Sequence, residues 1–252
     1  GSALVRAVLE SDDLVLGGAV ARSSAGGDIG TALGGEPVGV VVQAAVSEAI
    51  SDCDVLIDYT SHLAVMENAM AAIERRVAVV IGTSGLTGEQ YGQIDEAARR
   101  AEVGVIAAGN FSLTAAMAQA GALLAAHHLP QWEIIDYASS TKADVPSGTA
   151  RELAERLAAV REPIIGRSLD EIAGPREARG ATVAGSQVHS LRLPGFVVST
   201  EVVFGLPDER LVIRHDAGGT PTPYVAGTLL AARAAPGRVG LTRGLDTLLL
   251  EG

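Results

Sequence analysis

Short apolar runs alternate with helical patterns through the first 112 residues, and this alternation strongly limits how that part can fold. The runs are rich in Val and Ile, like strands that are buried on both faces of a sheet. They are DLVLGGAV (13–20), DVLIDY (54–59), VAVVIG (77–82) and VGVIAA (103–108). Strands alternating with helices at this spacing predict a Rossmann-like, doubly wound parallel sheet of the α/β class.

One of the intervening helices has a clear start. In LTGEQYGQIDEAARRAE, Thr87 precedes Gln90 by three residues. This is the spacing of a capping box, in which each side chain bonds to the backbone of the other residue. The sequence therefore predicts a helix that begins just after Thr87.

The second part of the chain, residues 113–216, has a different pattern. An Ala-rich helix at about 113–128 leads to the strand QWEIIDYA, a loop and the helix TARELAERLAAV. The later segments QVHSLRL, FVVSTEVVFGL and ERLVIRHDA follow one another with short turns, which indicates an antiparallel meander. We expect an α+β domain with a mostly antiparallel sheet. The helix TPYVAGTLLAARAA would then return, so that the first domain comprises 1–112 and 217–252.

The chain begins with GSALVRAVLESDD, which has the pattern of a helix. In a doubly wound sheet that binds a dinucleotide, such a helix follows a first strand and a glycine-rich turn. We therefore expect Gly1 to be the last glycine of that turn. About a dozen residues, the usual length of a strand and a turn, would precede it in the native protein.

Net charge and cysteine content narrow the classes of partner. The 252 residues carry a formal net charge of −11, which argues against nucleic acid or an anionic membrane surface as the main partner. No apolar run approaches the length that spans a membrane, and no signal peptide is visible. The single cysteine, Cys53, cannot form an internal disulfide, which suits a reducing cytoplasm. We expect a cytoplasmic protein without a metal centre.

The second predicted strand ends in Val-Ala-Arg-Ser-Ser, a sequence that bears on cofactor choice. Enzymes that bind NAD usually carry Asp or Glu here, where it bonds to the ribose hydroxyls. An Arg and two hydroxyls suit a 2′-phosphate instead, because a guanidinium can bind phosphate with two hydrogen bonds. We predict that Arg22, Ser23 and Ser24 bind the cofactor and favour NADPH over NADH. The alternative is a polar loop that binds nothing.

Two successive strand ends carry glycines and hydroxyls, in IGTSGLT (81–87) and AAGNFSLT (107–114). Such loops lie at the carboxyl edge of a parallel sheet, where ligands bind in this architecture. Each pattern alone is a common connector, but two on successive strands predict a cofactor cleft.

The sharpest pattern lies in IIDYASSTKADVPSGTARELAERL (134–157), where Pro-Ser-Gly-Thr stands at the start of a helix. The first N–H groups of a helix have no partner within it and lie at the positive end of its dipole. Gly148 lets an anion approach the backbone, and Lys142 adds a positive charge. Ser147 and Thr149 add hydroxyl donors. The stretch predicts an anion site, with a purely structural capping turn as the alternative.

One protein family has a signature similar to this stretch. The dihydrodipicolinate reductases carry E-x-x-x-x-H-H-x-x-K-x-D-x-P-S-G-T-A, which resembles EIIDYASSTKADVPSGTA here. Further segments resemble family motifs in the same order: VLIDYT, VIGTSGLT, AAGNFSLT and RGATVAGSQVHSLRLPGFVVSTEVVFG. The resemblance covers nearly the whole chain, and GSALVRAV is similar to the helix after the family's glycine-rich turn. It implies an NAD(P)H-dependent reductase related to lysine biosynthesis, usually a homotetramer assembled through the antiparallel sheet.

The resemblance assigns the substrate to the second domain, residues 113–216. It implies that Gly148 and Thr149 bind a substrate carboxylate, and that Lys142 supports substrate binding and proton delivery. It also implies a basic surface over the substrate, for which His189 and Arg192 are the candidates.

The resemblance assigns the cofactor to the strand ends of the first domain. The loop like the family's Gly-Thr-Thr contacts the nicotinamide end, and the Asn-Phe pair of the next strand closes that pocket. The cofactor-binding candidates are Gly1, Arg22, Ser23, Ser24, Tyr59, Thr60, Gly82, Thr83, Ser84, Asn110 and Phe111.

The chain departs from the family where the motif carries its chemistry. The two motif histidines are Ala138 and Ser139 here, and neither side chain can act as an acid near neutral pH. Proton delivery would then fall to Lys142, Tyr137 or water. His215 precedes the return to the first domain and is expected to be a hinge or surface residue.

Three functions stay open at this point. The favoured one is a reductase that has changed its substrate and transfers hydride to a C=N or conjugated double bond of a small carboxylated compound. The second is the ordinary lysine-pathway reaction with a replaced proton donor, and the third is a noncatalytic dinucleotide-binding protein. Hydride transfer depends mainly on positioning, so losing a general acid, worth typically ~10²–10⁴-fold, need not abolish it.

Overall fold

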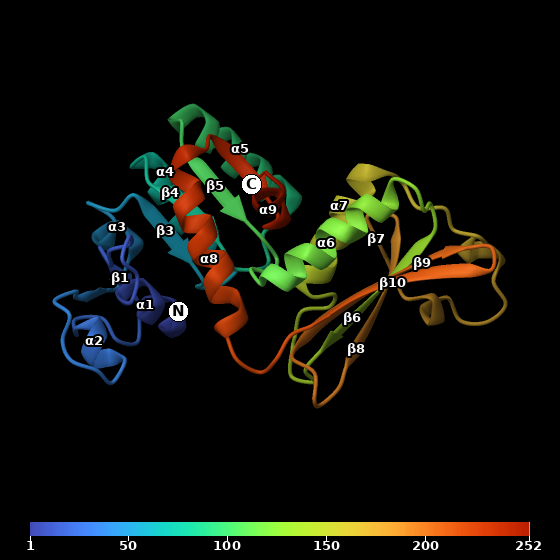
Figure 1. Cartoon of the computed structure of the whole chain (residues 1–252), viewed down its shortest axis with the longest axis horizontal. Coiled ribbons are helices and arrows are strands. Elements are labelled where there is room, and N and C mark those ends of the chain that lie inside the picture. The colour runs from blue at the N-terminus through green and yellow to red at the C-terminus, as the bar shows by residue number, and fades with distance from the viewer. Residues whose placement is uncertain (252) are drawn as a thin grey trace. The chain divides into compact units, whose positions relative to one another are not determined.

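The computed structural model describes residues 1–251, which divide into two units (Figure 1). Unit 1 comprises Gly1–Phe111 and Tyr224–Gly252, and unit 2 comprises Ser112–Pro223. The expected boundaries assigned residue 112 and residues 217–223 to the first domain, whereas the structure groups them with unit 2.

Unit 1 contains a four-stranded parallel sheet in the order β11-β5-β4-β3. Its strands are β3 (Val55–Asp58), β4 (Ala78–Ile81), β5 (Gly104–Ala107) and β11 (Gly240–Arg243). Every residue of β4 and β5 is buried, as in strands covered on both faces. The predicted α/β class is confirmed.

Helices α4 (Val65–Glu74), α5 (Gly88–Ala101) and α8 (Thr222–Ala234) connect or cover these strands, and Figure 1 shows α8 crossing the face turned to the viewer. The capping box that starts α5 is present. The Gln90 N–H donates to Thr87 Oγ1 (3.2 Å), and the Thr87 N–H donates to Gln90 Oε1 (2.9 Å). The remaining elements of unit 1 are α1 (Ser2–Leu9), β1 (Ala19–Val20), α2 (Ile29–Ala32), β2 (Val42–Gln43), α3 (Val46–Ala49), η3 (Ala235–Gly237) and α9 (Asp246–Leu250).

The predicted strand at 13–20 is largely wrong, because only Ala19–Val20 is a strand. It pairs in parallel with β2 in a separate two-stranded sheet. A strand needs a neighbour for its backbone, and residues 13–18 have none among the described residues. The Asp13 side chain is instead bound by Arg233 of α8, with Nε 2.7 Å from Oδ2.

Unit 2 contains a five-stranded sheet in the order β10-β9-β6-β8-β7. Its strands are β6 (Trp132–Ala138), β7 (Ala181–Val183), β8 (Ser186–Arg192), β9 (Val198–Leu206) and β10 (Glu209–Asp216). Only the β6–β8 pairing is parallel, so the predicted mostly antiparallel sheet is confirmed. The simple meander is wrong, however, because β6 lies between β8 and β9 and pairs with both.

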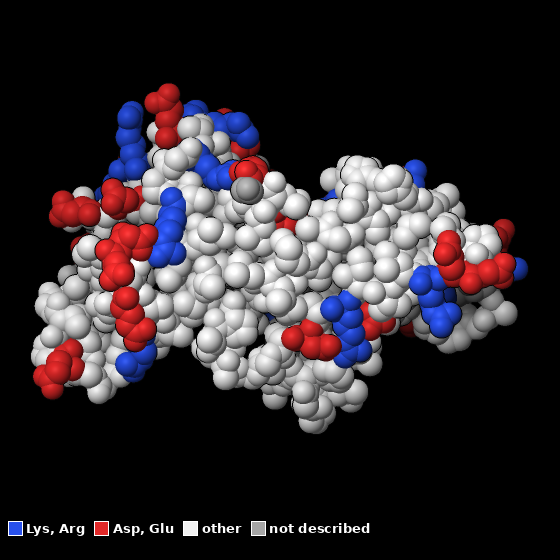
Figure 2. All heavy atoms as spheres, viewed as in Figure 1, with Lys and Arg blue, Asp and Glu red and all other residues white. Residues whose placement is uncertain are grey.

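Helices α6 (Leu113–Ala126) and α7 (Gly148–Val160) pack on one face of this sheet, around a core that includes Trp132, Ile134 and Phe204. We call this the helix face and the opposite side the outer face. Along β6, buried and half-buried residues alternate strictly between the two faces. Figure 2 shows few charges over α6, whose sequence contains none. Two short 3₁₀ helices, η1 (Leu169–Glu171) and η2 (Arg176–Arg179), lie before β7.

Candidate functional site

A hollow opens in unit 1 where the carboxyl ends of β3 and β4 meet. It has a volume of 410 Å³ and is lined by residues 59–62 and 82–84. Both loops were predicted to contact a cofactor, and the parallel pairing of the two strands brings them together. Among the described helices, none is both long and apolar enough to cross a membrane.

A buried carboxylate, Asp58, holds the two loops in place. It is 1% exposed and accepts hydrogen bonds at Oδ1 from the Thr60 N–H (2.9 Å), Thr60 Oγ1 (2.8 Å) and Thr83 Oγ1 (2.7 Å). Its Oδ2 accepts from Asn68 Nδ2 (2.8 Å). All four donors are neutral, and no cation pairs with Asp58 in the described chain. Sequence analysis missed this residue, although an Asp in an apolar strand must find such donors.

Tyr59 fills the space beside the same loops. Its hydroxyl bonds to Thr228 Oγ1 (2.8 Å), and its ring meets Phe111 edge to face with centroids 6.1 Å apart. Burial raises the pKa of Tyr59 to about 12, so the phenol stays neutral. A Cβ at Gly82 would lie 2.2 Å from the Tyr59 ring, which explains the glycine at this strand end.

The other predicted cofactor residues do not line this hollow. Gly1 is the N-cap of α1, and Asn110 is half-buried after β5. Residues 22–24 form a turn after β1, in which Arg22 and Ser23 are exposed. The described residues offer Arg22 no ion-pair partner, so its guanidinium is available to a ligand.

A second buried carboxylate, Asp136, lies on the helix face of β6 in unit 2 and is 0% exposed. Its Oδ2 accepts from the Ser147 N–H (2.8 Å), Arg192 Nη2 (2.8 Å) and Ser190 Oγ (3.1 Å). Its Oδ1 accepts from Ser147 Oγ (2.6 Å). A buried charge requires such compensation. Asp136, also missed by sequence analysis, thus fixes the residue that precedes α7.

Ser147 belongs to the scaffold. It is 1% exposed, its N–H and hydroxyl both donate to Asp136, and its Oγ accepts from the Ala150 N–H (3.3 Å). The prediction that its hydroxyl would bind the anion is therefore corrected. The Gly148 N–H donates to no described residue, and it lies at the positive end of the 13-residue α7.

Arg192 ties β8 to the loop before α7. Its Nη2 lies 2.8 Å from both Asp136 Oδ2 and the Asp144 carbonyl oxygen, and Nη1 lies 2.9 Å from the Leu191 carbonyl oxygen. The side chain is 15% exposed. The guanidinium therefore donates its hydrogen bonds to groups of the protein. The prediction for Arg192 was a direct contact with the substrate.

Lys142 lies in the same loop, with Nζ 2.7 Å from Asp144 Oδ1. Burial alone would raise the pKa of Asp144, but the hydrogen bond and charge of Lys142 outweigh it, and that pKa lies below its usual value. Lys142 and Asp144 therefore form an ion pair within the loop before α7, in addition to the pair that Asp136 of β6 forms with Arg192 of β8.

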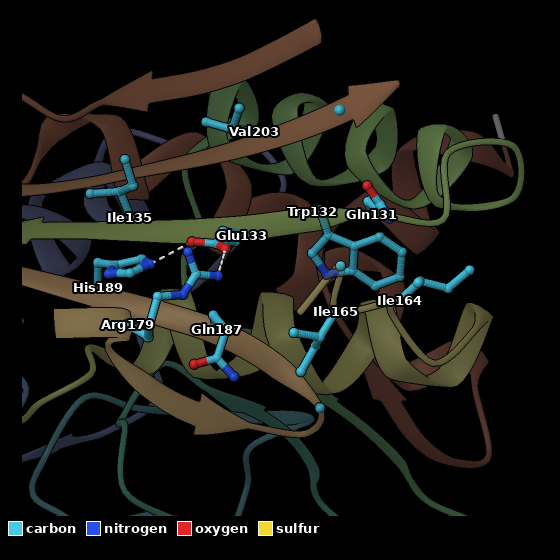
Figure 3. Close-up of a pocket in the computed structure, with 13 residues that line it drawn as sticks. Gln131, Trp132, Glu133, Ile135, Ile164, Ile165, Arg179, Gln187, His189 and Val203 are labelled. Atoms are coloured by element: carbon cyan, nitrogen blue, oxygen red, sulfur yellow. Dashed lines mark hydrogen bonds and ion pairs between the residues drawn. The ribbon is translucent and has the colours of Figure 1, made fainter. Parts of the chain in front are cut away.

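His189 does not face the α7 loop as predicted. Side chains alternate along a strand, so residues three apart point to opposite faces, and His189 lies on the outer face while Arg192 lies on the helix face. Figure 3 shows His189 and Arg179 both bonded to Glu133, with His189 Nε2 2.7 Å from Glu133 Oε2. These residues line a separate cavity of 540 Å³ with Trp132 and others.

Tyr137 also lies on the outer face, away from Asp136. Its hydroxyl donates to Glu201 Oε2 (3.3 Å), and the Arg214 guanidinium lies 4.7 Å from its ring centroid. Burial, together with Glu201, raises the pKa of Tyr137. The structure therefore does not bring this candidate acid to the start of α7.

His215 is not the surface or hinge residue that was expected. It is half-buried on β10, with Nε2 3.4 Å from Ser112 Oγ, the cap of α6. Burial lowers the pKa of His215, although the neighbouring Asp216 carboxylate acts in the opposite direction. Among the described residues, no three His, Cys, Asp or Glu side chains gather as a metal site would require.

Comparisons with known proteins decide the family. The family model "Dihydrodipicolinate reductase, N-terminus" matches residues 1–111, and "Dihydrodipicolinate reductase, C-terminus" matches residues 109–249. The chain belongs to the dihydrodipicolinate reductase family. It is therefore an NAD(P)H-dependent oxidoreductase.

Relatives of this family match along more than nine tenths of their length. The chain is 38% identical over 253 residues to 4-hydroxy-tetrahydrodipicolinate reductase of Moorella thermoacetica, covering 99% of this chain and 93% of that protein. It is 36% identical over 256 residues to the enzyme of that name from Thermosynechococcus vestitus, covering 99% and 92%. The structure of dipicolinate-bound dihydrodipicolinate reductase from a Paenisporosarcina species matches with a TM-score of 0.73 and 29% identity, covering 97% and 93%.

Ala138, the last residue of strand β6, and Ser139, which follows it, are the two positions where the resemblance expects histidines. Ala138 is 0% exposed and lies between Arg192 and Val198 in the sheet. Ser139 is half-buried, and its Oγ lies 3.0 Å from Thr141 Oγ1. Neither side chain can supply a proton near neutral pH.

Proposed function

We propose that the chain reduces a C=N or conjugated double bond of a small carboxylated compound, and that this compound differs from the lysine-pathway substrate. The observation that carries the proposal is the start of α7, where the Gly148 N–H lies at the positive end of the helix dipole with Thr149 beside it. Lys142, in the preceding loop, adds a positive charge near a bound carboxylate.

The change of substrate rests on Ala138 and Ser139. Ala138 is completely enclosed, so an imidazole at this position would require the surrounding side chains to repack. This supports a rebuilt site more than the loss of a single side chain. Of the two candidate acids, Lys142 lies in the loop before α7 and Tyr137 lies on the outer face, so Lys142 or water is proposed to deliver the proton.

The cofactor is proposed to be NADPH in preference to NADH. It supplies the hydride when it is bound. Arg22, Ser23 and Ser24 would hold the 2′-phosphate, and Gly1 would lie at the phosphates. Tyr59, Thr60 and residues 82–84 surround a hollow of 410 Å³ with hydroxyl groups, which suits the nicotinamide end, and Asn110 and Phe111 would close it.

A second candidate is the lysine-pathway reaction itself with a replaced proton donor. The names of the relatives, 34–38% identical and called 4-hydroxy-tetrahydrodipicolinate reductase, favour it. The homotetramer and the cytoplasmic location remain predictions, and the mass of the particle in solution would test the former.

The test is oxidation of NADPH by the purified protein with a panel of cyclic imines that carry a carboxylate. The lysine-pathway substrate, generated in place from its precursors, is run beside them. We expect clear turnover of at least one imine and weak or no turnover of the lysine-pathway substrate. A rate on that substrate typical of enzymes, ~10 s⁻¹, would instead establish the second candidate.

A paired variant tests the carboxylate site. Thr149→Val combined with Lys142→Ala should raise KM for the imine or abolish turnover, because both proposed contacts are lost. The Kd for NADPH, measured by fluorescence, should stay unchanged. An unchanged KM would exclude this loop as the carboxylate site.

A further inference from the structure

The proposed carboxylate site lies next to a negative charge of the protein. The Ser147 N–H, one residue before Gly148, is 2.8 Å from Asp136 Oδ2. Since the α-carbons of successive residues are about 3.8 Å apart, an anion on the Gly148 N–H would lie within about 10 Å of that carboxylate. Two like charges within this distance repel where burial limits solvent screening.

Arg192 compensates this charge. Its Nη2 lies 2.8 Å from Asp136 Oδ2, and the two side chains are 15% and 0% exposed. The second pair in the loop, Lys142 with Asp144, is also balanced, with 2.7 Å between Nζ and Oδ1. The charges of these two pairs therefore sum to zero, so that they do not oppose the attraction of the helix dipole for the anion.

We propose that Arg192 is a positioning residue that acts through charge: it neutralises Asp136 so that the start of α7 can bind a carboxylate. This rests on the proposed function only in taking the ligand to be a carboxylate. Asp136 has a structural role of its own, because it fixes Ser147 through the Ser147 N–H and hydroxyl. The pair thus provides a rigid support without a net charge.

A purely mechanical role for Arg192 makes a different prediction. Arg192 also bonds to the Asp144 carbonyl oxygen, so it could matter only as a tie for the loop. In that case, replacing either Arg192 or Asp136 should weaken ligand binding, and replacing both should weaken it at least as much. If Arg192 acts through its charge, replacing Asp136 should restore the binding that is lost when Arg192 is replaced. The sign of this change separates the two roles.

The experiment measures the Kd of dipicolinate by calorimetry with the full chain in the presence of NADPH. Dipicolinate is a planar dicarboxylate, and binding is measured without turnover, so failure of the proposed reaction would not affect the result. Arg192→Gln should raise Kd roughly 100-fold, because it leaves an uncompensated carboxylate near the ligand. Asp136→Asn should change Kd by less than about 3-fold, since an amide oxygen can still accept from Ser147.

The double variant Asp136→Asn/Arg192→Gln decides between the two roles. Its Kd should lie within about 5-fold of the wild-type Kd and well below the Kd of Arg192→Gln. Arg192→Lys, which keeps the charge, should stay within about 10-fold. Arg179→Gln is the matched control, because it removes an Arg–Glu pair from the outer face of the same sheet, and its Kd should not change.

Thermal unfolding confirms that each variant is folded before its Kd is read. If Arg192→Gln does not fold, Asp136→Asn alone still separates the two roles, because only the mechanical role requires that Asp136→Asn weaken dipicolinate binding. A double variant that binds as weakly as Arg192→Gln, or weaker, would overturn the proposal. So would a wild-type protein that binds no dipicolinate.

Discussion

Unit 1 and unit 2 each hold a loop of the proposed site on a buried aspartate, but the partners of the two carboxylates differ. Asp58 is surrounded by neutral donors from Thr60, Asn68 and Thr83. Asp136 is bound by Ser147, Ser190 and the Arg192 guanidinium. A cation therefore pairs with the second carboxylate, whereas none among the described residues pairs with the first. The same residue type is used to build two electrostatically different sites.

This difference matches the ligands proposed for the two units. A nicotinamide ring becomes positively charged when it has given up hydride, and a fixed negative charge nearby favours that form. A substrate carboxylate, in contrast, requires that Asp136 be neutralised. The difference in charge pairing agrees with the proposal that the nicotinamide binds at the Asp58 loops and the substrate carboxylate binds at the start of α7.

The largest expected effect is on stability, from Asp136→Ala. This change leaves Arg192 buried without its carboxylate, and truncating one partner of a buried ion pair typically costs about 3–5 kcal/mol. Urea unfolding followed by circular dichroism measures the loss. Arg179→Ala, which breaks a half-exposed pair, should cost about 0–1 kcal/mol and is the control.

Asp58→Ala should lower the free energy of unfolding by less, because the hydrogen-bond donors that lose their acceptor are neutral. Leaving buried hydroxyl and amide donors without an acceptor costs about 1–3 kcal/mol. The same urea experiment measures it, and Asp58→Asn, which keeps an acceptor oxygen, should cost less. If Asp58→Ala destabilised the protein as much as Asp136→Ala, the distinction between the two aspartates would fail.

Arg22→Ala tests the cofactor assignment of unit 1. We expect Kd for NADPH to rise by about 10- to 100-fold, because the bidentate contact to a 2′-phosphate is lost, while Kd for NADH stays within about 2-fold. Fluorescence titration with both cofactors measures this. Arg100→Ala is the control, since Arg100 is 72% exposed on α5. Equal increases in Kd for NADPH and NADH would mean that Arg22 does not bind the 2′-phosphate.

The smallest expected effect is the pH dependence contributed by His215. Its pKa is lowered in the folded chain by burial, so the unfolded chain binds the proton more readily. The contribution of His215 to stability is therefore complete above its unfolded pKa of about 6.5 and is lost as the pH falls through the lower, folded pKa. His215→Gln should show a shallower loss of unfolding free energy between pH 7 and pH 5. If the unfolding free energy of His215→Gln fell with pH as steeply as that of the wild type, His215 would not be the source of this pH dependence.

The sequence predicted best what depends on neighbouring residues. The capping box of Thr87 and Gln90 is present because both partners lie within one helical turn. The start of α7 at Gly148 also follows from its local sequence. The position of β6 between β8 and β9 could not be predicted in this way, because it depends on pairing between residues more than 40 positions apart, such as Ile134 and Val188.

The motif in the sequence singles out Lys142 and Gly148 as site residues, and this stays a prediction. The motif did not point to Asp58 and Asp136, the buried carboxylates that hold the loops of the candidate site. A signal was available, since each Asp stands inside an apolar strand, where a carboxylate is rarely buried unless it is compensated. The three-residue spacing of His189 and Arg192 likewise showed that only one of them could face the loop.

The hydrogen bonds of Ser147 have a consequence for protein engineering. Because Asp136 and Ser147 fix the start of α7, the proposed anion site at Gly148 does not rest on the side chains of residues 140 and 141, which are exposed. These positions can be randomised while the scaffold is kept intact. A library restricted to them would explore new substrates on an unchanged carboxylate anchor, and the stability of its members should stay close to that of the parent.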